Sequence, residues 1–298
     1  MVTSYRLKSL DETIAQLSRE DCQIIAGGTD LMVQHKSPRG APARFDEPIV
    51  FIDHLQELKR IRWVNQDLHI GACCTYSEML GHPLIPNILK KAIKEIAAPA
   101  IRNRGTLGGN ICNASPAGDT LPLLYLFNAR LQLKSAKGDR EVEIRDFIQG
   151  PRKVKRLKDE LVTEIILPNV QEDHTSFVFE KVANRKADAI TKISFAGLMR
   201  WDEGQIVDAR FAFGAVGPTI VRSAAIEQKI VGEAFPLEAA VVNGIVADFE
   251  RIIKPIDDQR STAIYRKTVA LHLLRYFIEN AGEERGYAIG QGKDHPVD

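Results

Sequence analysis

Two glycine-rich segments hold the residues best suited to contact a ligand. The first is IIAGGTDL at residues 24–31, and the second is IRNRGTLGGNICNASPAGD at residues 101–119. Glycine permits a positive φ in a turn and, having no Cβ, lets a ligand come close to the backbone. Successive N–H groups in such a turn can converge on an anion, helped by the start of a following helix. The two segments therefore predict a site for a phosphate or pyrophosphate.

The polar residues of the second segment suit different parts of a ligand. Thr106, Asn110, Asn113 and Ser115 carry neutral groups that can bond sugar and phosphate oxygens without charge repulsion. The carboxylate of Asp119 would be repelled by a phosphate, so it is better suited to accept hydrogen bonds from ribityl or ribose hydroxyls. One Gly-Gly pair is more often a plain turn, but two such segments in one chain favour a ligand site.

Other kinds of site find little support. Neither segment fits the G-x-G-x-x-G dinucleotide fingerprint, and the chain has no G-x-x-x-x-G-K-[ST] loop. The four cysteines form no C-x-x-C pair, which argues against zinc or an iron–sulfur cluster, so we expect no metal site. We find no catalytic triad or carboxylate pair and assign no catalytic residue. With 40 Lys+Arg and 39 Asp+Glu, the formal charge of +1 argues against a nucleic-acid binder.

The elements that position these segments follow from periodicity and capping signals. We predict helices after the N-cap candidates Ser9, Thr29 and Thr75. A further helix is expected at residues 88–96. Apolar or alternating runs predict strands at residues 22–26, 49–53, 61–64, 68–72, 131–134, 141–144 and 161–167. A turn carrying a basic cluster is expected at residues 149–153.

The second half of the chain shows a different order of predicted elements, with three strands followed by two helices. After a polar linker at 169–175, we predict strands at 177–182, 193–200 and 209–216. Helices are expected at 236–253 and 262–280, followed by a polar tail at 283–298. The start of the chain is polar, and no apolar run approaches the roughly 20 residues of a membrane span, so we expect a cytoplasmic protein.

Both glycine-rich segments resemble those of a known family. AGGTDL at residues 26–31 and RNRGTLGGNICNASPAGD at residues 102–119 look like the FAD-binding (medium) subunit of the xanthine dehydrogenase/carbon monoxide dehydrogenase molybdenum hydroxylases. The resemblance extends to ELVTEIILP at residues 160–168, FEKVANRKAD at residues 179–188 and AIYRK at residues 263–267. The four-cysteine insertion of 4-hydroxybenzoyl-CoA reductases has no counterpart between residues 128 and 160.

The resemblance implies an α+β FAD-binding fold of the PCMH/vanillyl-alcohol-oxidase type, plus a C-terminal three-stranded sheet with helices. It divides the chain into an FAD-binding domain at residues 1–170, with subdomains at about 1–54 and 55–170, and a C-terminal flavoprotein domain at residues 175–282. Residues 25–31 and 106–110 would hold the pyrophosphate, and Asp119 would contact ribityl or ribose oxygens. The implied cofactor-binding residues are Ile25, Ala26, Gly27, Gly28, Thr29, Asp30, Leu31, Thr106, Leu107, Gly108, Gly109, Asn110, Ser115, Asp119, Val162 and Lys181.

Lys181 allows two interpretations. The resemblance puts it and Val162 near the flavin, where a cation would stabilise the anion of the reduced ring. Alternatively, Lys181 is a solvated lysine on a strand.

The function implied is electron transfer. Electrons would pass from a partner subunit with two [2Fe-2S] clusters through FAD to NAD or another acceptor, and a large partner subunit would hold the molybdenum cofactor. One alternative is a stand-alone PCMH-type flavin oxidoreductase acting directly on a small molecule. Another is a binding or assembly module that has lost FAD.

Overall fold

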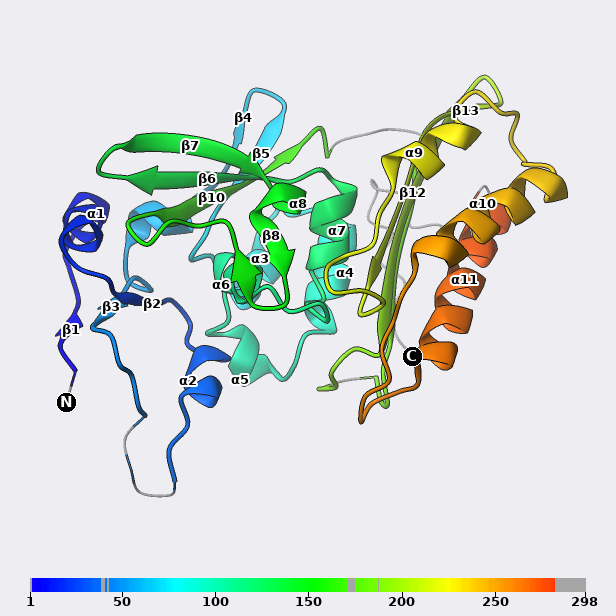
Figure 1. The fold of residues 1–298 in the computed structure, drawn as a ribbon. Coiled ribbons are helices and arrows are strands. Elements are labelled where there is room, and N and C mark those ends of the chain that lie inside the picture. The colour runs from blue at the N-terminus through cyan, green and yellow to red at the C-terminus, as the bar shows by residue number, and fades with distance from the viewer. Residues whose placement is uncertain (1, 39–40, 42, 171–174, 187, 282–298) are drawn as a thin grey trace, which may run out of the picture.

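The computed structural model of the chain describes residues 2–38, 41, 43–170, 175–186 and 188–281. The described residues form four sheets, of which the three larger ones follow one another across the molecule, with helices packed between and outside them (Figure 1). The architecture is therefore mixed helix and sheet, as the sequence predicts.

The N-terminal sheet is small and parallel. Its strands are β1 (Ser4–Tyr5), β3 (Ile49–Phe51) and β2 (Gln23–Ile25), in that order. Helix α1 (Leu10–Arg19) connects β1 to β2 and begins at Ser9, whose hydroxyl accepts a hydrogen bond from the N–H of Glu12. The short helix α2 (Leu31–Gln34) follows β2 directly.

The central sheet has five antiparallel strands. Their order is β4 (Ile61–Val64), β5 (Asp67–Gly71), β10 (Leu161–Pro168), β6 (Arg130–Ser135) and β7 (Gly138–Glu143). Helices α3 (Tyr76–Gly81), α4 (Asn87–Lys94), α5 (Pro99–Arg102), α6 (Leu107–Asn113) and α7 (Leu121–Leu126) lie on one side of it (Figure 1). The remaining short elements here are η1 (Gln56–Lys59), α8 (Ile144–Phe147), β8 (Ile148–Gly150) and β9 (Lys153–Val154).

The C-terminal sheet is an antiparallel meander of β11 (Thr175–Val182), β12 (Ile193–Asp202) and β13 (Gln205–Gly214). Helices α10 (Ala239–Ile252) and α11 (Ala263–Asn280) cover its outer face, and α4 and α7 lie against its other face (Figure 1). The short helices α9 (Ala224–Glu227) and η2 (Gln228–Ile230) follow β13.

One apolar core crosses from the central sheet to the C-terminal sheet. It includes Leu131 and Ile165 from the central strands, Leu123 from α7, and Phe177 and Leu198 from the C-terminal sheet. Because these side chains share one core, burial of apolar surface fixes the C-terminal sheet against α7.

Most predicted strands and helices are present, with shifted ends. The helix expected after Thr29 begins one residue later than predicted: Asp30 is the N-cap, and no side chain caps it. Helix α7 was not predicted, because every residue from Leu121 to Leu126 is buried, so the segment shows no amphipathic period. The expected linker 169–175 lies mostly, and the tail 283–298 entirely, outside the described residues.

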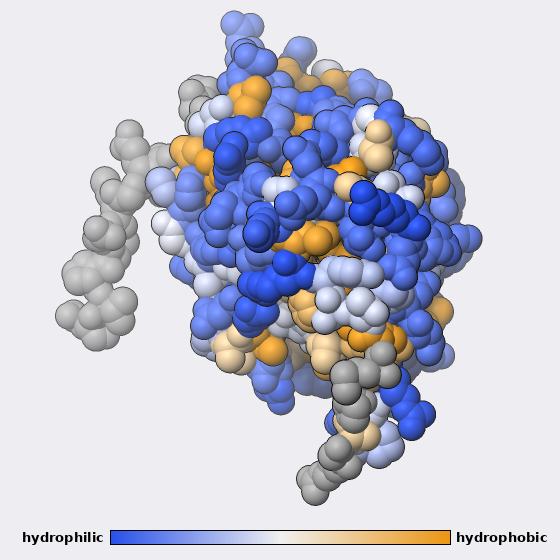
Figure 2. Space-filling view, turned by 90° about the vertical axis from the view of Figure 1, so that its left-hand side faces the viewer, coloured by the Kyte–Doolittle hydropathy of each residue, from blue (hydrophilic) through white to orange (hydrophobic). Residues whose placement is uncertain are grey.

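Two surface properties bear on partners. The face that carries the N-terminal elements is mostly hydrophilic, with separate small hydrophobic groups (Figure 2). Within the described ranges, no helix is long and apolar enough to cross a membrane.

Candidate functional site

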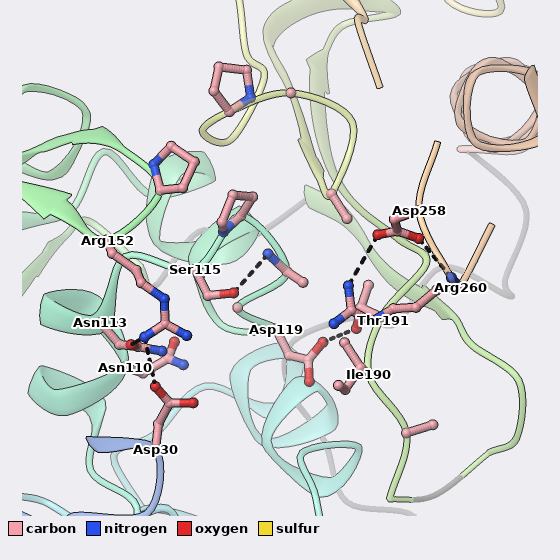
Figure 3. Close-up of a pocket in the computed structure, with 18 of the residues that line it drawn as sticks. Asp30, Asn110, Asn113, Ser115, Asp119, Arg152, Ile190, Thr191, Asp258 and Arg260 are labelled. Carbon is pink, nitrogen blue, oxygen red and sulfur yellow. Dashed lines mark hydrogen bonds and ion pairs between the residues drawn. The ribbon is translucent and has the colours of Figure 1, made fainter. Parts of the chain in front are cut away.

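A cavity of about 810 Å³ opens between the glycine-rich segments and the C-terminal sheet. This volume is within the range of about 300–1,000 Å³ that small-molecule sites occupy. Asp30 and Arg152 lie at one side, Asp258 and Arg260 at the other, and Ser115, Asp119 and Thr191 between them (Figure 3). Further lining residues are Ile96, Ala97, Asn110, Asn113, Pro116, Ala117, Gly118, Pro151, Asp188, Ala189, Ile190, Ala215, Gly217, Pro218, Lys254, Ile256 and Arg266.

The two glycine-rich segments touch each other at Gly27. A Cβ built on Gly27 would overlap the carbonyl of Arg104 in the second segment. Only glycine permits this contact, which draws the loop after β2 onto the loop before α6. Gly28 has a φ of +70°, in the left-handed region that glycine adopts without strain. Gly27 and Arg104 are 77 positions apart in the chain, and their contact brings the two loops together.

The first segment presents a row of free backbone donors. No hydrogen bond within the described residues uses the N–H groups of Gly27, Gly28, Thr29 or Asp30. Unpaired N–H groups are rare in folded proteins unless water or a ligand satisfies them. Consecutive free donors beside a left-handed residue are typical of a concave anion-binding nest.

The second segment uses its N–H groups internally instead. Leu107 donates to the carbonyl of Cys74, Gly108 to that of Ala72, and Asn110 to that of Thr106. The N–H of Gly109 donates 3.1 Å to Oγ1 of Thr106, the N-cap of α6. A convergence of these N–H groups on an anion, which the sequence suggested, is therefore absent here. The segment can still offer side chains, since Asn110 lines the cavity.

Gly108 in α6 lies so close to the turn after β5 that a side chain would not fit. A Cβ there would lie 2.7 Å from both Cβ and the carbonyl oxygen of Ala72. The residue therefore permits close packing of α6 on the turn after β5.

One rim of the cavity carries a polar cluster. Arg152 Nη1 lies 3.4 Å from Asp30 Oδ2 and 3.4 Å from Asn113 Oδ1, and Gln34 Nε2 donates to the same Asn113 oxygen at 3.2 Å. Arg152 belongs to the basic turn expected at 149–153, although the sequence assigned it no role at the site. The exposure of about half of both charged side chains leaves them free to rearrange around a ligand.

The centre of the cavity holds a buried ion pair. Lys181 Nζ donates at 2.8 Å to Asp119 Oδ2 and at 2.8 Å to the carbonyl of Glu95, and the hydroxyl of Thr191 donates to Asp119 Oδ1. The Lys181 side chain is only 3% exposed, so the solvated alternative is wrong. Burial raises the pKa of the Asp119 carboxyl, while the Lys181 ammonium and the Thr191 hydroxyl oppose that rise.

The structure brings some of the sequence-predicted residues to the cavity and leaves others in the framework. Those that line it are Asp30, Asn110, Ser115 and Asp119, with Lys181 directly behind Asp119. Ala26, Gly27, Gly28, Thr29 and Leu31 form the adjacent loop and the start of α2, and Thr106 and Gly109 form the cap of α6. Ile25, Leu107, Gly108 and Val162 are buried in the framework.

Residues missed by the sequence analysis come mainly from the C-terminal half. Thr191 follows the FEKVANRKAD segment by three residues, a proximity that could have indicated it. Lys254, Asp258 and Arg260 lie in no motif, whereas Arg266 lies in the AIYRK segment at residues 263–267, to which the sequence analysis gave no role at the site. The packing of α11 and its preceding loop brings all four to the cavity. No group of three or more His, Cys, Asp or Glu residues in the described ranges could hold a metal ion.

Two protein families match adjacent parts of the chain. The family described as "FAD binding domain in molybdopterin dehydrogenase" matches residues 1–170. The family described as "CO dehydrogenase flavoprotein C-terminal domain" matches residues 179–281.

Individual relatives match nearly the whole chain. The glyceraldehyde dehydrogenase medium chain of Sulfolobus acidocaldarius is 31% identical over 269 residues, covering 89% of this chain and 92% of its own. The xanthine dehydrogenase FAD-binding subunit of Escherichia coli O157:H7 is 29% identical over 293 residues, covering 96% of each. A solved carbon monoxide dehydrogenase chain from Hydrogenophaga pseudoflava superposes with a TM-score of 0.85 at 27% identity, covering 96% of this chain and 98% of that one.

Proposed function

The chain belongs to the FAD-binding (medium) subunits of the xanthine dehydrogenase/carbon monoxide dehydrogenase family of molybdenum hydroxylases, and from this membership we propose that it carries electrons through FAD bound in the cavity described above. It is an oxidoreductase subunit. Electrons enter from the [2Fe-2S] clusters of a small partner subunit and leave to NAD or another acceptor. A large partner subunit holds the molybdenum cofactor, and the complex works in the cytoplasm.

The observation that carries this proposal is the row of four free N–H donors at Gly27–Asp30. A pyrophosphate has many acceptor oxygens and a negative charge, and four consecutive free N–H groups can donate hydrogen bonds to such an anion. The position of the cavity supports the same proposal, because the cavity begins at Asp30, at the end of this loop, and runs past Asp119 to the C-terminal sheet.

The remaining residues of the proposed site have separate tasks. Asn110 and Ser115 bond sugar and phosphate oxygens from the second segment. Asp119 accepts hydrogen bonds from ribityl or ribose hydroxyls through lone pairs that Lys181 and Thr191 leave free. We keep Ile25, Ala26, Leu31, Thr106, Leu107, Gly108, Gly109, Val162 and Lys181 in the proposed site as the residues that shape and support it.

The protein's part in the reaction is positional and electrostatic. FAD, when bound, exchanges electrons with both one-electron and two-electron partners. Lys181 Nζ donates hydrogen bonds to both Asp119 and the Glu95 carbonyl, which fixes its position beside the cavity. The Lys181–Asp119 ion pair has no net charge, so we expect it to orient hydrogen bonds to the flavin rather than to add a free positive charge beside it. The apolar core around α7 excludes water from the side of the Lys181–Asp119 ion pair that faces away from the cavity.

A matched pair of glycine variants tests the proposal. Gly28 and Gly204 have φ values of +70° and +78°, and a Cβ at either would meet no atom closer than 3.4 Å. Gly28→Ala and Gly204→Ala should each destabilise the fold by roughly 1–2 kcal/mol through left-handed strain. Only Gly28→Ala, beside the cavity, should also weaken FAD binding, followed by the flavin absorption of the purified chain titrated with FAD and reduced with dithionite. Equal FAD affinity in the two variants would contradict the pyrophosphate assignment.

A second arm addresses the alternative of a stand-alone flavoenzyme. Our proposal expects the flavin-loaded chain to oxidise no small-molecule substrate without its partner subunits. Turnover by the chain alone would favour the alternative.

A further inference from the structure

The wall of the cavity formed by the C-terminal half carries an excess of positive charge. Lys254, Arg260 and Arg266 line it together with two carboxylates, Asp188 and Asp258. Gly217 and Pro218 complete this wall with a loop that carries no charge. The three cations against two carboxylates give this wall of the cavity a local formal charge of +1.

Arg266 is the anchor of this wall and is incompletely satisfied. The residue is only 4% exposed. Its Nη2 donates 2.7 Å to Asp258 Oδ1, and its Nη1 donates 3.3 Å to the carbonyl of Ala215. Its buried Nε has no hydrogen-bond partner in the described part of the chain. A buried charged donor without an acceptor is costly, which favours a ligand that brings one.

The other two cations are available at the mouth. Arg260 Nη1 pairs with Asp258 Oδ2 at 3.1 Å, yet 45% of its side chain is exposed. Lys254 is exposed, and its ammonium has no partner within the described ranges. Asp258 is already bonded by Arg260 and Arg266, so it orients these two guanidinium groups rather than cancelling all the charge.

We propose that Lys254, Arg260 and Arg266 form an anion subsite that holds a phosphate group of a nucleotide electron acceptor while that acceptor reaches the flavin. This inference rests on the proposed function, because it takes the flavin to lie beside Asp119 and Thr191 in the same cavity. The free donors at Gly27–Asp30 lie at the opposite side of that cavity and serve a different phosphate. Arginine and lysine side chains are the usual phosphate ligands, and arginine adds a bidentate geometry.

Charge-removing variants of the two exposed cations test the subsite. The double variant Lys254→Gln/Arg260→Gln should bind NADH about 10-fold or more weakly, because it loses charge-assisted hydrogen bonds. The matched control is Lys229→Gln/Arg251→Gln, which removes the same charge from cations that pair with Asp248 and do not line the cavity. NADH affinity is measured by fluorescence titration of the chain purified with its accompanying subunits, at full FAD occupancy.

Two further probes identify what the subsite recognises. Inorganic pyrophosphate should compete with NADH on the wild-type protein, and reduced nicotinamide riboside, which has no phosphate, should bind the double variant and the control equally. An NADH affinity that is the same in the double variant and the control would overturn the subsite. The subsite would also be overturned if the double variant weakened riboside binding as much as it weakens NADH binding. Absence of saturable NADH binding to the wild-type protein would overturn it as well.

The readouts separate this inference from the function on which it rests. Failure of the proposed function shows as an absent flavin absorption band. Failure of the subsite shows as unchanged NADH affinity in a protein that keeps its full flavin band. Arg266→Lys gives an independent check in protein saturated with FAD, since it keeps the charge but removes the Nε donor, and it should weaken NADH binding.

Discussion

Lys181 on β11 and Asp119 at the end of the second glycine-rich segment form a buried ion pair, with Nζ and Oδ2 2.8 Å apart. The pair joins the C-terminal sheet to the helices under the central sheet. It also borders the cavity, so one interaction contributes to the packing of the two halves and to the proposed site.

Removing one charge of this pair should destabilise the protein strongly. Asp119→Asn leaves the ammonium of Lys181 buried without its counter-ion, and breaking a buried pair typically costs about 3–5 kcal/mol. The double variant Asp119→Asn/Lys181→Gln should recover part of that loss. Urea unfolding of the single and double variants gives the coupling energy, and additive effects would show that the pair contributes little.

Gly27 should tolerate no side chain. A Cβ at this position overlaps the carbonyl of Arg104, so Gly27→Ala must push the two glycine-rich loops apart. Overpacking of this kind costs typically about 1–3 kcal/mol. We expect a lower free energy of unfolding and weaker FAD binding, measured by urea titration and flavin absorption. Gly81→Ala is the control, since nothing lies within 4 Å of a Cβ there; wild-type behaviour of Gly27→Ala would contradict the contact.

The stability contributed by Asp258 should depend on pH. Desolvation raises the pKa of Asp258, but the N–H groups of Arg260 and Ser261 and the Arg266 guanidinium outweigh it and lower the pKa from 3.8 to about 2. A lowered folded pKa means that this stabilisation is present above pH 3.8 and is lost as the pH falls towards 2. Solvent screens part of the effect, so we expect about 1 kcal/mol. Asp258→Asn should therefore lose stability at pH 6 and match the wild type near pH 2, and a pH-independent difference would refute this.

Arg222 and Glu227 should hold the C-terminal sheet to α7. Arg222 Nε lies 3.0 Å from Glu227 Oε1, and its Nη1 reaches Asn128 Oδ1 at 2.7 Å. Glu227 is 3% exposed, so Glu227→Gln should cost about 3 kcal/mol or more. Glu279→Gln, in an exposed pair with Arg275, should cost about 1 kcal/mol or less. Similar losses in the two variants, measured by urea unfolding, would show that burial is not what matters.

The cysteines should be unreactive while the chain is folded. Burial raises the pKa of Cys73 and Cys74 to about 12 and that of Cys112 to about 11. The thiolate is the reactive form, so at pH 8 a thiol reagent should modify these residues only when the structure opens. Labelling should quicken in step with added urea, and the unfolded chain should react at all four cysteines. Rapid labelling of Cys112 in the native protein would indicate an accessible thiolate instead.

Local patterns in the sequence predicted the elements well because capping and periodicity act over a few residues. Thr75 forms the expected capping box with Glu78, and Ser9 caps α1 as predicted. The prediction of Thr29 as an N-cap was wrong, because Thr29 and Asp30 lie in a turn and α2 begins only at Leu31, so that Asp30 takes that position. Helix α7 escaped prediction, because a segment buried on all sides loses the pattern that marks a helix.

The sequence alone identified the glycine-rich loops, the polar side chains and the carboxylate as candidates for a ligand site, because residue type and spacing are enough to indicate them. Only the tertiary structure decided which glycines leave their N–H groups free and which serve packing, because that depends on neighbours far along the chain, such as Arg104 for Gly27 and Ala72 for Gly108. It also decided that Lys181 is buried against Asp119 and that Arg266 reaches the same cavity. Side chains so distant in sequence are brought together by the burial of a shared core, which no local pattern records.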